Sequence, residues 1–189
     1  MTCIAAVVKD GVVYMGGDCA GVSGQDLTLM KDDKVFIVGP MLIGYTTSFR
    51  MGQLLRYALD VPHHPDGMPD DAYMATLFID AVRACLKEGG YALKEKEQES
   101  GGAFLVGYHG KLFMVDSDYQ VLRPRDDYHA MGCGAAAATG SLFSTWDRMP
   151  WIRLEFALGA AEHCNVGVRG PFTYLRLPAL DLKEIGACS

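Results

Sequence analysis

Several features that would place this chain in a large functional class are missing. The longest apolar run, residues 35–45, is interrupted by Gly39-Pro40 and Gly44 and falls short of a membrane span. Basic residues are not in excess, since 17 lysines and arginines stand against 23 aspartates and glutamates and give a net charge of −6. This balance argues against nucleic acid or an anionic membrane as a partner. Neither of the glycine-rich motifs GxGxxG and GxxxxGKS/T occurs, so nucleotide binding has no support.

Signals for secretion and for a bound metal are missing as well. The N-terminus has neither the basic segment nor the cleavage site of a signal peptide, so we expect a cytoplasmic protein with reduced thiols. The adjacent histidines His63 and His64 stand in a proline-rich segment, where a solvated loop is the favoured interpretation and a metal site the alternative. The cysteine spacings fit neither a zinc knuckle nor a CxxC redox pair, and we expect no cofactor and no metal. The six cysteines are Cys3, Cys19, Cys85, Cys133, Cys164 and Cys188.

The composition that is present fits one globular domain. Half of the residues are hydrophobic and 21% are charged, which is enough apolar material to bury a core. A length of 189 residues fits a single domain over residues 1–189. We find no tandem repeat and no internal linker.

The expected elements come in alternating blocks of strands and helices. Strands are expected over 3–8 and 12–17, joined by the turn Lys9-Asp10-Gly11, and over 30–38 and 41–46. Helix 48–59, capped by Ser48, precedes a second helix that is capped by Asp70 and ends at Gly89-Gly90. Residues 94–100 are expected to form an exposed turn or helix extension. The remaining elements are strands 103–108, 111–115 and 128–131, helices 135–146 and 152–164, and strand 172–177. This order indicates an α+β fold with two antiparallel sheets between pairs of helices.

Three residues in the first part of the chain form a candidate catalytic group: Thr2, Asp18 and Lys34. Met1 precedes a small residue, the situation in which a methionine aminopeptidase trims the chain, and its loss would make Thr2 the N-terminus. A free α-amine, with a pKa of about 7.7–8.0 in model compounds, supplies a base beside the threonine hydroxyl. A nearby lysine favours the neutral amine and stabilises developing negative charge, while a carboxylate keeps that lysine charged and oriented. Trimming by one residue more would expose Cys3 instead, but strand alternation turns Cys3 toward the core.

The arrangement of these residues resembles the β-type proteasome subunits and the bacterial HslV proteolytic subunit. The segment from Thr2 through the turn to Asp18 is similar to the N-terminal hairpin of that family, and Lys34-Val35-Phe36 is similar to its motif around the catalytic lysine. Residues 130–134, AMGCG, resemble the motif that precedes the third helix of the family. The resemblance runs from Thr2 to about residue 177. It implies the N-terminal-nucleophile (Ntn) hydrolase fold, a four-layer αββα sandwich, with Thr2 as nucleophile.

The resemblance also assigns supporting roles, in which this sequence departs from the family. Ser48 stands where the family has a glycine whose backbone N–H stabilises the oxyanion, and Cys133 replaces a serine that hydrogen-bonds near the amine. Asn165 falls at a supporting aspartate and Val168 at a supporting serine. Arg50 would favour an acidic substrate side chain, with an exposed helix residue as the alternative. The substrate-binding positions are Gly21, Thr46, Thr47, Arg50 and Leu54.

The function that the resemblance implies is a threonine-type peptidase that cleaves peptides or unfolded proteins inside a ring-shaped assembly. Family members form stacked rings of six or seven subunits, so we expect a homo-oligomeric single or double ring, fed by an ATP-dependent unfoldase. The first alternative is a ring-forming scaffold without activity, which the altered supporting residues favour. The second alternative is an amidase or peptide ligase of different substrate on the same fold.

Overall fold

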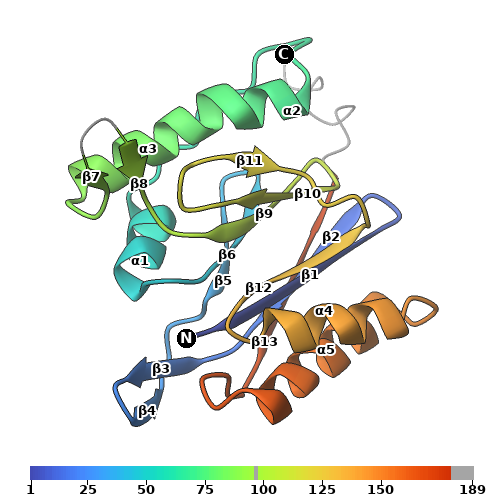
Figure 1. Ribbon diagram of the computed structural model, residues 1–189. Helices are drawn as coiled ribbons and strands as arrows, with labels where there is room; N and C mark the ends of the chain where they lie inside the picture. Colours follow the sequence, from blue (N-terminus) through green and yellow to red (C-terminus); the bar gives the residue numbers. More distant parts are fainter. Residues whose placement is uncertain (96–97, 180–189) are drawn as a thin grey trace.

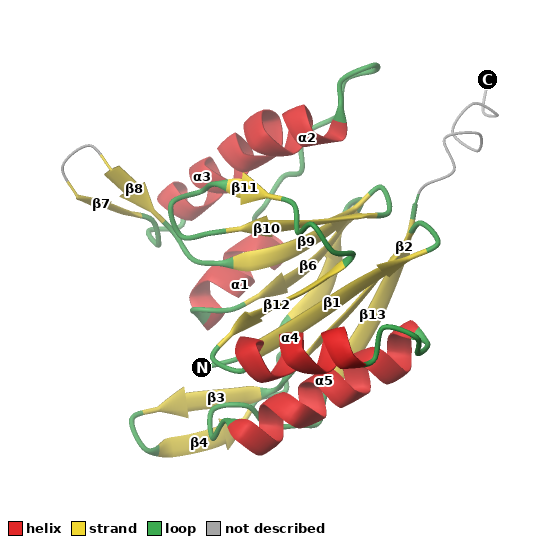
Figure 2. Ribbon diagram, turned by 45° about the vertical axis from the view of Figure 1, so that its right-hand side comes forward, coloured by secondary structure: helices red, strands yellow, loops and turns green. Residues whose placement is uncertain are grey.

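Two sheets packed face to face lie between two layers of helices (Figure 1). The first sheet has the strand order β12-β1-β2-β13 and the second the order β11-β10-β9-β6-β5. Helices α4 and α5 cover the outer face of the first sheet, and α1, α2 and α3 lie over the outer face of the second (Figure 2). This computed structural model describes residues 1–95 and 98–179. The expected four-layer α+β sandwich is confirmed.

The first sheet is built around β1, which pairs antiparallel with both β2 and β12. Asp10 and Gly11 make the β1–β2 turn with positive φ values of 51° and 71°, as the turn signal in the sequence predicts. Because side chains alternate along a strand, Cys3 faces α4 and α5, whereas Ile4 faces the second sheet. The strands are β1 (Cys3–Lys9), β2 (Val12–Gly17), β12 (Tyr128–Gly132) and β13 (Thr173–Pro178).

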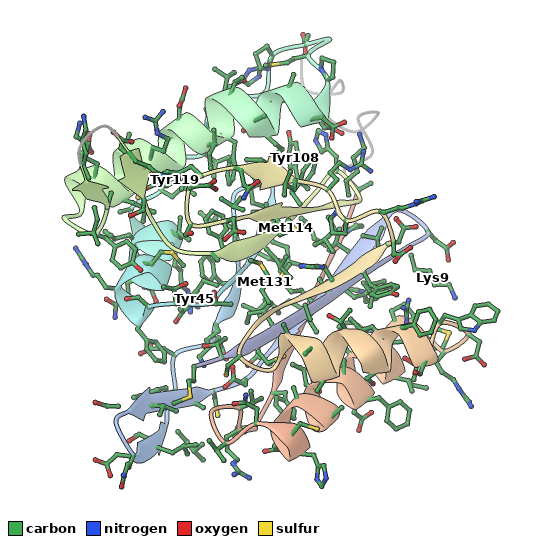
Figure 3. The ribbon with its side chains drawn as sticks, viewed as in Figure 1. Lys9, Tyr45, Tyr108, Met114, Tyr119 and Met131 are labelled. Carbon is green, nitrogen blue, oxygen red and sulfur yellow. The ribbon has the colours of Figure 1, made fainter. Side chains whose placement is uncertain are left out.

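The second sheet is antiparallel throughout. Its inner face packs against the first sheet, and Met114 and Met131 enter this shared core from one sheet each (Figure 3). Its outer face carries the large aromatic and aliphatic cluster under α1 and α3. The strands are β5 (Val35–Val38), β6 (Met41–Tyr45), β9 (Phe104–Tyr108), β10 (Lys111–Val115) and β11 (Val121–Leu122).

The helices begin close to the expected positions. Ser48 caps α1 by accepting a hydrogen bond from a backbone N–H of the first turn, as expected. The expectation that Asp70 caps the second helix is wrong, because Pro69 occupies the cap position. Burial works to raise the pKa of Asp70, but hydrogen bonds from Lys111 and His109 outweigh it and hold that pKa below its ordinary value. The helices are α1 (Phe49–Tyr57), α2 (Asp70–Tyr73), the π-helical turn η1 (Met74–Phe78), α3 (Ile79–Glu88), α4 (Ala135–Ser144) and α5 (Pro150–Cys164).

Two short hairpins differ from the sequence-based expectation. The first, β3 (Ala20–Ser23) with β4 (Asp26–Leu29), stands apart from both sheets (Figure 2). No strand was expected over 20–29, and the strand expected over 30–38 begins only at Val35, after the exposed residues 31–33. The second, β7 (Leu93–Glu95) with β8 (Gln98–Ser100), forms where we expected a turn or helix extension. All side chains of β4 are exposed, so the polar–apolar alternation of its sequence, D-L-T-L, corresponds to no buried face.

Two further expectations concern membranes and cysteines. Among the described residues, no helix is long and apolar enough to cross a membrane. Five cysteines lie in the described part of the chain and all five are free thiols, while Cys188 lies outside it. Cys3, Cys19 and Cys85 are buried, and Cys133 and Cys164 are exposed.

Gly132 allows β12 to approach the start of β1 closely. Its φ is +98°, and a Cβ at this position would overlap the carbonyl oxygen of Thr2. We expect Gly132→Ala to lower the free energy of unfolding by about 1–3 kcal/mol through backbone strain alone. Chemical denaturation measures the loss.

Gly140→Ala is the matched control for this substitution. Gly140 lies in α4, and a Cβ there would meet nothing within 4 Å. This variant should keep the stability of the parent protein or gain up to about 1 kcal/mol from helix propensity. Equal stability of the two variants would contradict the strain expected at Gly132.

Candidate active site

A cavity of about 330 Å³ opens beside the start of β1. Its wall comes from the N-terminus, from β3 and from the segment that leads from β6 into α1, which converge in Figure 1. A larger hollow, about 600 Å³, lies at the C-terminal end of α5; Asn165 lines it, but none of the three candidate catalytic residues does. The smaller cavity is therefore the candidate active site. It is lined by Met1, Thr2, Val22, Lys34, Tyr45, Thr46, Thr47, Ser48, Phe49 and Arg50.

The three candidate catalytic side chains meet at the base of this cavity. Lys34 Nζ lies 3.0 Å from Thr2 Oγ1 and 3.0 Å from Asp18 Oδ1. Its third acceptor is the carbonyl oxygen of Ala20, 2.6 Å away. The side chains of Lys34 and Asp18 are 1% and 0% exposed. Because each ammonium proton has a protein acceptor, the buried pair is satisfied without water.

Backbone groups hold the Asp18 carboxylate in place. Oδ1 accepts a hydrogen bond from the Cys3 N–H and Oδ2 accepts one from the Ala20 N–H, both at 3.0 Å. These donors come from β1 and from the start of β3, so the carboxylate joins two segments that flank the cavity. The ring of Phe49, with its centroid 5.5 Å from Lys34 Nζ, covers the ammonium from the side of α1.

The backbone of Thr2 contacts a pair of polar side chains. The Thr2 N–H donates to Cys133 Sγ at 3.2 Å. The Cys133 thiol lies within reach of two acceptors, the Thr2 carbonyl at 3.4 Å and Asn165 Oδ1 at 3.2 Å. Asn165 Nδ2 donates to the Cys133 carbonyl at 3.0 Å, and Asn165 Oδ1 accepts from the Gly167 N–H at 2.9 Å. Cys133 thus contacts the Thr2 nitrogen and Asn165 contacts Cys133, whereas Val168 is fully buried and apolar.

Met1 determines the chemical state of Thr2. With Met1 in place, the Thr2 nitrogen is a peptide N–H, and the Thr2 hydroxyl donates to the Met1 carbonyl. The Met1 side chain packs against Gly167, where a Cβ would overlap it. An amide nitrogen cannot accept a proton at neutral pH, so general-base chemistry at this position needs the free amine of Thr2.

The segment expected to stabilise the oxyanion forms a tight turn. Thr47 has a φ of +63°, and the Ser48 N–H donates to the Thr46 carbonyl at 2.7 Å. The Thr46 hydroxyl donates to the Ala103 carbonyl at 2.7 Å, and Thr47 Oγ1 accepts from the Ala103 N–H at 3.2 Å. The turn is therefore fastened to the start of β9, and the Ser48 N–H is engaged within it.

The expected substrate-binding residues divide into two groups. Thr46, Thr47 and Arg50 line the cavity. Gly21 and Leu54 do not line it: Gly21 lies in β3 next to the lining residue Val22, and Leu54 is buried in the core beneath α1. The Arg50 side chain is exposed and donates from Nη2 to the Gly89 carbonyl at 3.1 Å.

Sequence analysis missed two groups that complete the site. The Ala20 carbonyl accepts a hydrogen bond from the Lys34 ammonium, and the Phe49 ring covers that ammonium. A backbone carbonyl has no signature in residue type, so its contribution could not be deduced from the identity of Ala20. Phe49 could have been suspected, because it starts the helix that follows the expected oxyanion segment.

Removing the lysine of the buried pair should destabilise the fold. Lys34→Ala leaves the Asp18 carboxylate buried without its ammonium partner, and we expect a loss of about 3–5 kcal/mol in the free energy of unfolding. Adding Asp18→Ala should recover part of that loss, because no unpaired charge then remains. Urea denaturation measures both variants. Lys31→Ala, at an exposed lysine three positions earlier, should change stability by less than about 0.5 kcal/mol, and a similar small effect of Lys34→Ala would contradict the buried pair.

The thiols should differ sharply in reactivity. Burial, with a further contribution from Asp18, raises the pKa of the Cys3 thiol to about 12. Alkylation needs the thiolate, so at pH 8 Cys3 should stay unmodified in the folded protein while the exposed Cys133 and Cys164 react with iodoacetamide. Peptide mapping locates the modified cysteines, and unfolding in urea should expose Cys3 to the reagent. Equal labelling of Cys3 and Cys164 without urea would contradict the buried environment that raises the pKa of Cys3.

Comparison with known proteins identifies the fold through structure. No protein-family model matches the sequence, and no curated protein sequence matches it significantly. The structure is similar to BPH from Thiobacillus denitrificans in complex with epoxomicin, with a TM-score of 0.79 and 18% identity over 95% of this chain and 100% of that one. HslV from Trypanosoma brucei gives a TM-score of 0.66 and 15% identity, covering 94% of this chain and 99% of that one.

A third neighbour agrees with these two. Anbu (ancestral beta-subunit) from Yersinia bercovieri has a TM-score of 0.63 and 14% identity, covering 94% of this chain and 82% of that one. All three are below 25% identity, so the likeness shows the fold. The chain has the proteasome-like Ntn-hydrolase fold that its sequence motifs indicate.

Proposed function

We propose that this protein is a threonine peptidase in which Thr2, once freed from Met1, is the nucleophile. The observation that carries the proposal is the buried Lys34 ammonium, which lies 3.0 Å from both Thr2 Oγ1 and Asp18 Oδ1. A lysine that is fully buried next to a hydroxyl in an open cavity suits stabilisation of a developing alkoxide. A purely structural ion pair has no need of a hydroxyl at that distance.

The proposed reaction follows the chemistry of an N-terminal nucleophile. The neutral α-amine of Thr2 takes the proton of its own hydroxyl, and Oγ1 attacks the carbonyl carbon of a peptide bond. The tetrahedral intermediate collapses to an ester on Thr2, and the protonated amine gives its proton to the leaving amine of the substrate. The same amine then activates a water molecule, which hydrolyses the ester. Lys34 stays protonated throughout and Asp18 keeps it oriented.

Stabilisation of the oxyanion is the step that requires a conformational change in this structure. The Ser48 N–H donates to the Thr46 carbonyl, so it can serve an oxyanion when substrate opens this turn. Hydrogen bonds of catalytic sites are often misaligned before substrate binds. Cys133, whose sulfur lies 3.2 Å from the Thr2 nitrogen, is proposed to hold the freed amine together with Asn165.

We further propose that the protein works as a homo-oligomeric ring with its sites facing an internal chamber. Support comes from large apolar side chains that protrude from α4, α5 and their connection. Phe143, Trp146 and Phe156 are 70%, 77% and 54% exposed. An exposed apolar surface of this kind is typical of a protein–protein interface.

A non-catalytic ring scaffold is the second candidate. Two observations favour it: the Ser48 N–H is engaged in the turn, and the Thr2 hydroxyl donates to Met1. An amidase or ligase on the same fold would keep the nucleophile and differ in substrate. These candidates predict different outcomes in one experiment.

The test compares two forms of the same protein, with Met1 retained and with Met1 removed by methionine aminopeptidase. Each form is exposed to a peptide epoxyketone such as epoxomicin, which reacts with the hydroxyl and the free amine of an N-terminal threonine. Intact mass should show one adduct on the Met1-free form and none on the other. Thr2→Ala should abolish the adduct, and Lys34→Ala should slow its formation by about 10²-fold or more.

Cys3→Ala is the control, since Cys3 faces the core of the first sheet, and it should leave labelling intact. Absence of an adduct on the Met1-free form would support the scaffold. An adduct without hydrolysis of any peptide in a mixed library would support an amidase or ligase.

A further inference from the structure

A cluster of two histidines and an aspartate lies on the second sheet, away from the candidate active site. It joins His64, from the loop between α1 and α2, to Asp70 in the first turn of α2 and His109 in the β9–β10 turn. One ligand atom from each residue lies within 4.8 Å of the other two. We propose that these three residues bind a divalent transition-metal ion, with zinc the best match. This proposal is independent of the peptidase function.

The two distances from the aspartate oxygen to the imidazole nitrogens suit a zinc site after small adjustments. Asp70 Oδ1 lies 2.9 Å from His109 Nδ1 and 3.8 Å from His64 Nδ1. Ligands that bind zinc tetrahedrally at about 2.0–2.1 Å lie about 3.4 Å from one another, midway between these two values. Two imidazoles and one carboxylate are a donor set for zinc and related metals, whereas magnesium and calcium prefer oxygen ligands alone.

His64 is already in the tautomer that a metal needs. Its Nε2 lies 2.7 Å from the Met68 carbonyl, and because a carbonyl can only accept, Nε2 carries the proton. The lone pair therefore sits on Nδ1, which accepts from the Tyr108 hydroxyl at 2.7 Å. Metal-binding histidines commonly donate their other N–H to a backbone carbonyl in this way. His64 is consequently not the solvated loop residue that we expected, unlike the exposed His63.

Aromatic packing fixes the orientation of both imidazoles. His64 stacks on Tyr73 with ring centroids 4.3 Å apart and an interplanar angle of 4°. His109 stacks on Tyr108 at 3.9 Å and 18°. Tyr73 and Tyr108 belong to the buried core under α2 and α3, where Figure 3 labels Tyr108. The rings therefore lie on a rigid base, so little side-chain freedom would be lost when a metal binds.

Lys111 orients the carboxylate and leaves one oxygen for the metal. Its Nζ lies 2.7 Å from Asp70 Oδ2, so Oδ1 is the oxygen that faces the two histidines. Asp70 Oδ1 also accepts from His109 Nδ1, and this proton must leave when a metal takes its place. The side chains of His64, His109 and Asp70 are 16%, 22% and 14% exposed, which gives an ion a path from solvent.

Such a site would fasten the α1–α2 loop and the start of α2 to the β9–β10 turn. Three protein ligands leave a fourth position for water or for the nearby Tyr108 hydroxyl. Since the ion binds the folded chain, it should raise the free energy of unfolding with metal concentration.

The experiment uses the full chain, stripped of metal with a chelator and titrated with Zn²⁺ against a competing chelator. We expect one equivalent to bind and the melting temperature to rise. Co²⁺ should give visible absorption of a four-coordinate site with nitrogen and oxygen ligands, without the charge-transfer band of a thiolate. His109→Gln and His64→Gln should each weaken zinc binding at least tenfold.

His63→Gln is the matched control, because it alters the exposed neighbour in the same loop, and it should bind zinc as the parent does. A Cys133→Ser/Cys164→Ser variant should do so too, which separates this site from the exposed thiols. Absence of binding by the parent protein, undiminished binding by both histidine variants or a thiolate band with Co²⁺ would each overturn the proposal. If a histidine variant fails to fold, the Co²⁺ spectrum of the parent protein still shows whether the ligands are nitrogen and oxygen or thiolate, and so tests the proposal.

Discussion

The candidate active site depends on a lysine and an aspartate that are buried together. Removing two charges from water costs several kcal/mol per ion, and the cost is recovered where every proton and lone pair has a partner. Here the Lys34 ammonium donates hydrogen bonds to Asp18, Ala20 and Thr2. The Asp18 carboxylate also accepts hydrogen bonds from backbone N–H groups of β1 and β3. These contacts require the start of β1, the residue after β2 and the residue before β5 to meet at one point. The local arrangement of the chain follows from this requirement.

Close approach of the backbone is the second constraint on the site. Gly132 lets β12 run against the carbonyl of Thr2, and the next residue then places its thiol beside the Thr2 nitrogen. A polar contact at the N-terminus is thus set by backbone geometry in a strand far along the chain. This explains why Cys133 can occupy a position where a hydroxyl is expected: the backbone fixes its place, and the side chain changes the strength of the contact.

The sequence predicts the parts of this structure that depend on local composition and on the family motifs. Small and β-branched residues along 3–8 and 12–17 and the turn between them predict the central hairpin, and the resemblance to the proteasome family implies that Thr2, Asp18 and Lys34 meet. The β3–β4 hairpin is missed because each of its strands has only four residues and the alternating sequence of β4 buries no side chain. The partners of Asp70 could not be predicted for another reason. His109 and Lys111 contact it through tertiary structure, which no local sequence signal encodes.

Under the proposed function, activity is controlled by one covalent bond more than by a conformational change. The Thr2 nitrogen already lies beside Cys133, and the hydroxyl already lies beside Lys34, while Met1 is present. The peptide bond between Met1 and Thr2 makes the Thr2 nitrogen non-basic, because the amide lone pair is delocalised and this nitrogen can only donate a hydrogen bond. Cleaving this bond creates the base without moving the lysine or the carboxylate. The turn at Thr46–Ser48 is the part that must still adjust, and it lies on the substrate side of the cavity, where binding can supply the energy.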